Sequence, residues 1–421
     1  MIFLVILALT LIIKFWLIKR QQDHIILHQN VVPELFRHQV TLDAHQKATA
    51  YTQTELKLEK IELLISSALL IFLTIGGGLQ RLDDLWQGFA LHADITGLLI
   101  VISLLVIFWL IALPTTLWRI FVIEQKYGFN RTSPVLYIED QIRKAIVTII
   151  VIVPLVYSMI WLVNHHDTWW LIIWVFWLGF TLSAMWLYPV LIAPLFNKFV
   201  LLDDPDLYQR FDNLFKRMGL KNSGIFVMDG SKRSRHGNAY FTGVGRNKRI
   251  VIYDTLLHAL DNDEIEAVLA HEVGHYYYGH IYKRFVTMAI YSLLGLILMN
   301  WLSTQIWFYN GLGVNQANAQ MTLILFILCA PLVSFFLQPL LMSFSRRDEY
   351  QADDFSSQHS NAQHLEQALT KLYKDNAVSL TADSLYADFN YSHPTALARI
   401  KHLQHSHAKI NYPENQVTHH E

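Results

Sequence analysis

Seven apolar runs, each long enough to cross a bilayer as a helix, constrain this chain more than any other feature. They are Ile2–Leu17, Ile61–Leu79, Leu98–Leu117, Ala145–Val163, Trp169–Leu187, Phe285–Leu302 and Met321–Met342. Charged residues make up 16% of the 421-residue chain, whereas a soluble domain carries about 25%. We therefore expect a mainly α-helical, polytopic membrane protein whose seven transmembrane helices contact the lipid bilayer.

The loops between these runs alternate in their content of lysine and arginine. Residues 188–284 hold thirteen and residues 18–60 hold six, whereas the loops at 164–168 and 303–320 hold none. By the positive-inside rule, the N-terminus lies outside and the C-terminus and the largest loop lie in the cytoplasm. The membrane would be the inner membrane of a bacterium or the endoplasmic reticulum membrane of a eukaryote. No basic residue precedes the first run and no small-residue cleavage site follows it, so we expect an uncleaved anchor.

Charge and cysteine content exclude several kinds of function. The formal net charge is -1, so the chain lacks the basic footprint of a nucleic-acid-binding protein, and no nucleic-acid partner is expected. The single cysteine, Cys329, lies inside an apolar run and excludes both an intrachain disulfide and a cysteine-rich zinc site. A metal site in this chain must therefore use histidine and carboxylate ligands.

The segment between the fifth and sixth runs, residues 201–281, is predicted to form a small cytoplasmic α/β unit. Its elements are a helix at Asp206–Met218 and strands at Gly224–Met228, His236–Gly243 and Arg249–Tyr253, the last two joined through Gly245, Arg246 and Asn247. We divide the chain into an N-terminal membrane domain at 1–200, with five transmembrane helices and cytoplasmic loops, and a second domain at 201–421. The second domain holds two transmembrane helices, at about 285–302 and 321–342, and a cytoplasmic tail.

A further helix is predicted to begin after Asp261, which forms a capping-box pattern with Glu264. Because no proline follows before the end of the sixth run, we expect one helix of about 40 residues that enters the membrane. Its first half carries His271, Glu272 and His275. Two histidines four residues apart lie on one helix face and can bind one Zn²⁺, and the glutamate between them can exchange a proton with a water on that metal.

A catalytic zinc site needs a third protein ligand, and the sequence after the seventh run offers two carboxylates. Glu349 and Asp353 are four residues apart on one helix face, so one can bind the metal while the other accepts the free ring N–H of a ligand histidine. Glu349 lies roughly 10 Å and His275 roughly 15 Å from the bilayer core on the same side, which allows them to meet. The alternative is that both carboxylates form surface ion pairs with Arg346 and Arg347.

The remaining histidines are predicted to have no part in metal binding. His280 lies five residues after His275, about 140° around a continuous helix, so we expect it to face away from the metal and to be structural. The C-terminal tail is expected to be a solvated segment rather than a metal site. Its histidines are His402, His405, His407, His419 and His420.

These features predict an integral-membrane, zinc-dependent endopeptidase, a hydrolase that acts on peptide or protein substrates and binds one Zn²⁺ per chain. One alternative is a membrane quality-control metalloprotease, which shares the zinc motif but usually has fewer spans. Another is a transporter or scaffold whose zinc site is only structural. No span carries an acidic residue near its middle, whereas coupled transporters usually use intramembrane carboxylates, which argues against the transporter.

Five motifs together resemble the type I CAAX prenyl protease family of integral-membrane zinc metalloproteases, over nearly the whole chain. They are Glu124–Thr132 (EQKYGFNRT), Ser231–Phe241 (SKRSRHGNAYF), His271–His275 (HEVGH), Glu349–Asp353 (EYQAD) and His393–Arg399 (HPTALAR). The resemblance implies hydrolysis of peptide bonds near the C-terminus of prenylated CAAX-like peptides. It also implies seven helices that enclose a chamber and a small, gluzincin-like zinc-protease unit in the cytoplasm.

The same resemblance implies roles for individual residues. The positions that match the zinc ligands are His271, His275 and Glu349. Glu272 matches the catalytic glutamate, which takes a proton from the attacking water and returns it to the leaving amine. His393 and Arg399 match positions over the cleft, where they would stabilise the oxyanion.

The resemblance also implies a surface that binds the peptide substrate. Asn238, Ala239 and Tyr240 match an edge strand that pairs with an extended peptide, a mode of binding that depends little on peptide sequence. Gly237 departs from the serine expected there in many relatives, and we expect this glycine to loosen the start of the strand.

Overall fold

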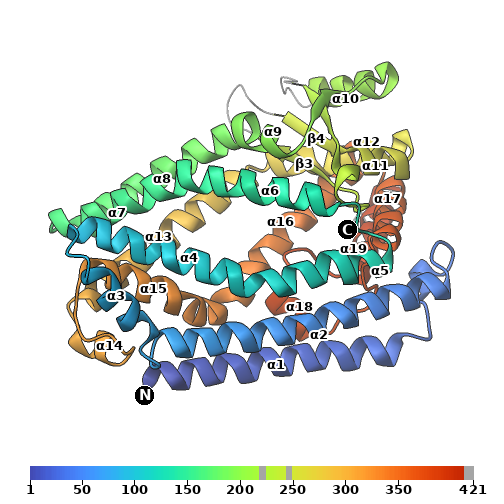
Figure 1. Cartoon of the computed structure of the whole chain (residues 1–421). Coiled ribbons are helices and arrows are strands. Elements are labelled where there is room, and N and C mark those ends of the chain that lie inside the picture. The colour runs from blue at the N-terminus through green and yellow to red at the C-terminus, as the bar shows by residue number, and fades with distance from the viewer. Residues whose placement is uncertain (218–223, 243–248, 412–421) are drawn as a thin grey trace, which may run out of the picture.

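The computed structural model describes residues 1–217, 224–242 and 249–411 (Figure 1). The helices are α1 (Ile2–His28), α2 (Leu42–Leu73), α3 (Gly78–Gln87), α4 (Ala93–Trp118), α5 (Gln125–Tyr127), α6 (Pro134–Val147), α7 (Val153–His165), α8 (Trp169–Leu187), α9 (Ala193–Phe196), α10 (Pro205–Arg217), α11 (Asp254–Ala259), α12 (Asn262–Tyr277), α13 (His280–Ser303), α14 (Ile306–Asn310), α15 (Ala319–Ser334), α16 (Gln338–His359), α17 (Ala362–Asp375), α18 (Ser384–Asn390) and α19 (Ala396–Asn411). The strands are β1 (Phe199–Leu201), β2 (Ile225–Met228), β3 (Ala239–Thr242) and β4 (Arg249–Tyr253).

Six helical stretches in the described part of the chain are long and apolar enough to cross a membrane. They are Ile2–His28, Ala93–Tyr127, Pro134–His165, Trp169–Phe196, His280–Ser303 and Gln320–His359. A seventh span forms if α2 and α3, which are bent by 52° at the break between them, count as one. The predicted second run therefore does not continue as one straight helix to Leu79, because Gly77 adopts a left-handed φ of 71°. The predicted polytopic, mainly helical fold is confirmed.

The spans bury little of their surface inside the molecule. Between 6% and 22% of the most apolar stretch of each span is buried. In Figure 1 the long helices run beside one another, with α1 and α2 at one edge and α7 and α8 at the opposite edge. Low burial is what helices with one face toward lipid and another toward an open interior would have. The enclosed chamber stays a prediction.

One span widens where a proline interrupts its hydrogen bonding. Pro154 has no N–H to donate to the carbonyl of Ile150, and the helix there passes through the π-helical turn η3 (Thr148–Ile152). Comparable turns are η2 (Arg119–Glu124) and η4 (Tyr188–Ile192). These turns let the apolar runs remain helical over lengths of 28 to 35 residues.

The prediction of one 40-residue helix is wrong, because the segment forms two helices. Its start is as predicted: Asp261 and Glu264 form a capping box with both hydrogen bonds at 3.0 Å. However, α12 ends at Tyr277, and Gly279 has a left-handed φ of 65° before α13 begins at His280. Helices commonly end at a glycine in the left-handed conformation.

The predicted α/β unit contains a four-stranded sheet of order β1-β2-β4-β3. β2 and β4 are parallel, and the two outer strands pair antiparallel with their neighbours. β3 thus lies at an edge, bonded to β4 on one side, and begins at Ala239 rather than at His236. The strand β1 was not predicted. Met218, Gly243 and the predicted turn at Gly245, Arg246 and Asn247 lie outside the described residues.

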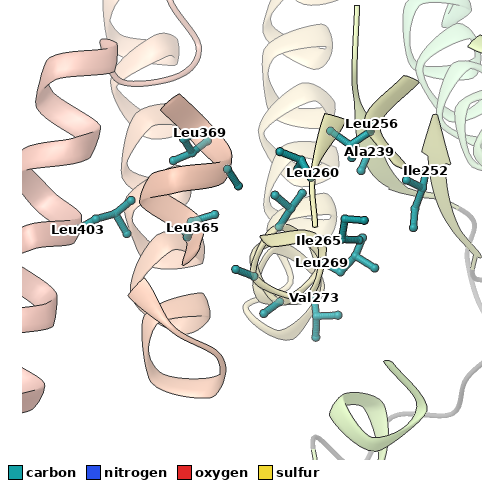
Figure 2. Packing of buried hydrophobic residues seen from close by; sticks show 14 of the residues in the cluster. Ala239, Ile252, Leu256, Leu260, Ile265, Leu269, Val273, Leu365, Leu369 and Leu403 are labelled. Carbon is teal, nitrogen blue, oxygen red and sulfur yellow. The ribbon is translucent and has the colours of Figure 1, made fainter. Parts of the chain in front are cut away.

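A hydrophobic core fixes α12 in place, and Figure 2 shows its side chains packed between two layers. One layer is the sheet with α11, and the other is formed by α17 and α19. The residues labelled there are Ala239, Ile252, Leu256, Leu260, Ile265, Leu269, Val273, Leu365, Leu369 and Leu403, all buried. Truncating one such leucine or isoleucine to alanine typically costs about 2–5 kcal/mol. The helix that carries the HEVGH motif is therefore held on both flanks.

Candidate active site

Three side chains from α12 and α16 converge on one point. Nε2 of His275 lies 3.2 Å from Nε2 of His271 and 3.3 Å from Oε1 of Glu349, whose Oε2 lies 3.5 Å from Nε2 of His271. One ligand atom from each residue lies within 4.8 Å of the others. Around an ion bound at about 2.0–2.2 Å, tetrahedral ligand atoms lie about 3.3–3.5 Å apart. The donor set and its spacing therefore fit a transition-metal ion.

Close contact between α12 and α16 brings the carboxylate to the histidines. A Cβ added to Gly274, within the HEVGH motif, would lie 3.1 Å from Cα of Ala352 and 3.0 Å from Cβ of Phe355. Only glycine permits this approach without a shift of the helices, and Glu349, on the same helix as Ala352, is 1% exposed. The helix spacing at one residue thus determines whether the carboxylate of Glu349 reaches the two histidines.

The alternative in which the carboxylates form surface ion pairs is wrong. Both Glu349 and Asp353 are buried, and no ion pair links them to Arg346 or Arg347 among the described residues. Arg346 instead pairs with Asp388 at 2.9 Å and donates to backbone carbonyls of α18 and its C-terminal end.

His271 is held by Asp353, which contacts the ring nitrogen that faces away from His275 and Glu349. Its Nδ1 lies 2.9 Å from Oδ1 of Asp353, which in turn binds Arg399 through two hydrogen bonds of 2.7 and 2.8 Å. Burial and Arg399 lower the pKa of His271, but the hydrogen bonds to Asp353 and Glu349 outweigh them and raise it to about 9. A ligand imidazole must be neutral at the coordinating nitrogen, so metal binding displaces that proton.

His275 has a corresponding partner, and it is His280. The two Nδ1 atoms lie 2.8 Å apart, and Nε2 of His280 lies 3.0 Å from Oε1 of Gln351 and 3.4 Å from Oδ1 of Asp348. The prediction that His280 faces away from the metal site is wrong. Its 140° offset assumed one continuous helix, whereas the break at Gly279 turns the histidine, which is 1% exposed, back toward His275.

The edge strand β3 runs along α12 beside Glu272 of the HEVGH motif. The backbone N–H of Phe241 donates a hydrogen bond to the carboxylate of Glu272, and the Phe241 ring stacks on Tyr276 with centroids 5.0 Å apart. Burial raises the pKa of Glu272, while His271 and the bond from Phe241 oppose part of that rise. A carboxylate suited to accept a proton thus lies between the metal-binding cluster and the strand.

The last two predicted site residues lie at the same cluster but in different environments. Nδ1 of His393 is 2.8 Å from Oε2 of Glu349, and its side chain is 64% exposed, so it sits over the site and faces solvent. Arg399 is buried against Asp353, and its Nη2 lies 3.2 Å from the His271 ring nitrogens. The geometry brings both residues to the site, and Arg399 is first of all a partner of Asp353.

Comparison with known proteins accounts for nearly the whole chain. Residues 21–198 match the family model described as CAAX prenyl protease N-terminal, five membrane helices, and residues 201–407 match that of peptidase family M48. The chain is 37% identical to CAAX prenyl protease 1 homolog of Arabidopsis thaliana over 69% of each chain. It is 34% identical to CAAX prenyl protease 1 of Saccharomyces cerevisiae over 70% of this chain and 69% of that one. The chain belongs to the CAAX prenyl protease 1 family.

As a member of the CAAX prenyl protease 1 family and of peptidase family M48, the protein is a multi-span membrane metallopeptidase. The crystal structure of Ste24p from S. mikatae superimposes on 95% of this chain and 98% of that one, with a TM-score of 0.87 and 27% identity. The human homolog is 31% identical over 76% of each chain. These matches extend over the membrane helices and the peptidase part together, so they do not favour a smaller quality-control protease, a transporter or a scaffold.

A second group of residues at the site of this CAAX prenyl protease homologue was not predicted. Asn376, at the end of α17, binds both backbone groups of Gly237, at 3.2 and 3.4 Å, and Nδ1 of His236 at 3.2 Å. Nε2 of His236 lies 3.5 Å from Glu124, which accepts a hydrogen bond from Tyr51 of α2. The expectation that Gly237 loosens the start of the strand is wrong, because these contacts fix it. Glu124, His236 and Gly237 lie in two of the five motifs that resemble the family, and this was the available signal for them in the sequence.

The predicted solvated tail is described as far as residue 411. His402 lies in α19 and binds Oδ1 of Asp354 at 2.7 Å, and His405 is exposed on the same helix. Positions 412–421, with His419 and His420, are not described, and the side chain of His407 is not described either.

Proposed function

We propose that this chain is a zinc endopeptidase that cleaves near the C-terminus of prenylated CAAX peptides, with its active site on the cytoplasmic side of the membrane. One observation carries the proposal: the two histidines, Glu349 and Glu272 meet beside an edge strand, close to where α12 gives way to the membrane helix α13. The substrate class follows from the names of the relatives, which are CAAX prenyl proteases in a plant, a yeast and an animal.

Zinc is the ion that this donor set favours. Two imidazole nitrogens and one carboxylate oxygen from three residues leave one position open, which is the arrangement of catalytic zinc sites. Zinc bound there would lower the pKa of a water toward 7. The Asp353–His271 and His280–His275 contacts both occupy the ring nitrogen that faces away from the cluster, so each imidazole presents Nε2 to the ion.

The protein's own groups then handle the proton and the developing charge. Glu272 takes the proton from the attacking water and delivers it to the nitrogen of the departing amine. His393, exposed above Glu349, is positioned to donate a hydrogen bond to the oxyanion. Arg399 holds Asp353 and adds positive charge near His271.

Substrate binding is assigned to the free edge of β3. Asn238, Ala239 and Tyr240 precede the Phe241 backbone that contacts Glu272, so a peptide paired with them would pass the catalytic carboxylate. Backbone pairing holds an extended peptide whatever its side chains are. The orientation proposed from the lysine and arginine counts places this strand in the cytoplasm.

The test is a cleavage assay on a farnesylated CAAX peptide beside its unmodified twin, with metal content measured on the same sample. We expect faster cleavage of the farnesylated peptide, loss of cleavage on chelation and about one zinc per chain. Equal rates on the two peptides would remove the prenyl specificity and leave the peptidase. Full activity in metal-free protein would refute the zinc mechanism.

A further inference from the structure

A basic cavity of about 600 Å³ lies at the start of the proposed substrate strand. Its basic residues come from four separate segments: Lys47 of α2, Arg131 after α5, Arg235 before β3 and His258 of α11. One carboxylate, that of Asp375 at the end of α17, also lines it. The cavity therefore presents a surplus of positive charge. These basic residues have no part in the metal site or in the mechanism proposed above.

Among the described residues, the basic side chains that line this cavity lack the kind of carboxylate partner that the neighbouring Arg233 has. Arg233, two residues before Arg235, binds Asp140 through two hydrogen bonds of 2.8 Å. In the described part of the chain, by contrast, neither Arg131 nor Arg235 has a side-chain carboxylate partner. The Lys47 ammonium lies over the ring of Phe129, 5.5 Å from its centroid. Unpaired guanidinium groups in a concavity are suited to bind a carboxylate or a phosphate.

The backbone holds the two arginines near each other. An isolated antiparallel bridge joins Asn130 to Ser234, and the N–H of Arg235 donates to the carbonyl of Phe129 at 3.1 Å. The N–H of Arg131 donates to the carbonyl of Arg233 at 3.0 Å. The backbone of the two segments that carry these arginines is thus fixed, which reduces the entropy lost when an anion binds between them.

The position of the cavity relative to β3 gives the direction of a bound substrate. Phe241, toward the C-terminal end of β3, stacks on Tyr276, four residues before the membrane helix α13 begins. Gly237, before the N-terminal end of β3, lines the cavity. A lipid-modified cysteine must lie on the membrane side, so the chain that follows it runs along β3 toward Gly237 and the cavity.

We propose that this cavity binds the C-terminal carboxylate of the substrate, an inference that rests on the proposed function. Cleavage after the modified cysteine of a CAAX peptide leaves three residues, which span about 10 Å when extended. Arg235 precedes Asn238 by three residues, so a peptide aligned with β3 brings its terminus within reach of Arg235 and Arg131. The cavity would therefore select a free C-terminus and set the length of the segment removed.

The experiment compares a farnesylated CAAX peptide that has a free carboxylate with the same peptide as its C-terminal amide. We expect wild-type kcat/KM to be about 10-fold to 100-fold higher for the acid, chiefly through KM, because a charge-assisted hydrogen bond is lost in the amide. In the Arg131→Gln/Arg235→Gln double variant this ratio should fall close to one. Inorganic phosphate is the probe for a free anion as the ligand. If phosphate raises the melting temperature of the wild type but the acid-to-amide ratio is one, the cavity binds anions and not the substrate terminus.

Lys232→Gln is the matched control, because Lys232 is an exposed cation on the same segment that does not line the cavity. Its acid-to-amide ratio should equal that of the wild type. A wild-type ratio near one, or a double variant that keeps the full ratio with an unchanged melting temperature, would overturn the inference and leave the proposed function intact. Failure of metal-loaded wild type to cleave either peptide would refute the substrate class and this inference together.

Discussion

Nδ1 of His275 lies 2.8 Å from Nδ1 of His280, although the two residues belong to different helices. The left-handed Gly279 turns the chain between them, so that a residue beyond the end of α12 returns to its last turn. Nε2 of His280 then contacts Gln351 of α16, two residues beyond Glu349. The same interhelical contact therefore supports one of the proposed histidine ligands and lies beside the proposed carboxylate ligand.

Replacing His280 with alanine should weaken zinc binding by roughly 10-fold to 100-fold, because His275 loses the partner that fixes its ring orientation. The measurement is the zinc dissociation constant from competition with a chelator of known affinity. His405→Ala, which removes an exposed histidine of α19, is the control and should bind zinc like the wild type. Unchanged affinity in His280→Ala would show that the contact does not support the site.

Glu272→Gln should retain zinc and lose peptidase activity by roughly 100-fold to 10,000-fold, the range typical of a missing general base. The amide keeps the shape of the side chain and can still contact the Phe241 backbone, so folding should be unaffected. Metal content and kcat are measured on one preparation. Robust proteolysis by this variant would contradict the assigned proton transfer.

His393→Ala should lower kcat by roughly 100-fold to 1,000-fold with little change in zinc content, as expected for the loss of one oxyanion donor. Its exposed side chain contacts Glu349 but is not needed to fill a core. Elemental analysis separates this role from metal binding. Loss of zinc in the variant would show that His393 is itself a ligand.

The contact between His236 and Glu124 should make stability depend on pH. The hydrogen bond to Glu124 raises the pKa of His236, against the effect of burial. A histidine whose pKa is higher in the folded state than in the unfolded state stabilises the fold. The stabilisation is complete below the unfolded pKa of about 6.5 and is lost as pH rises through the folded pKa. The wild type should therefore lose more melting temperature between pH 6 and pH 8 than His236→Gln does. Parallel curves for the two proteins would contradict the assignment.

Much of the metal centre could be predicted from sequence because it depends on local spacing. His271 and His275 share a helix face, and so do Glu349 and Asp353, whatever the rest of the chain does. Burial of Glu349 depends on the close approach of α16 to Gly274, which no local pattern reveals. The ion-pair alternative could be rejected only when that packing was known.

The errors arose where backbone conformation or distant contacts decide the result. The expected long helix ends because of one left-handed glycine, and that alone changed the position of His280. The three residues of β1 are too few to give a periodic signal, and they are held by pairing with β2. The contacts of His236 join segments more than 100 residues apart in sequence, so no spacing rule could have found them.

Zinc titration of chelator-treated protein tests the central claim most directly. Peptidase activity should return in proportion to added zinc and reach its maximum at about one ion per chain, while Glu349→Ala should regain neither tight binding nor activity. Full proteolysis by the wild type without a metal ion, or wild-type zinc affinity in Glu349→Ala, would contradict a catalytic metal held jointly by α12 and α16.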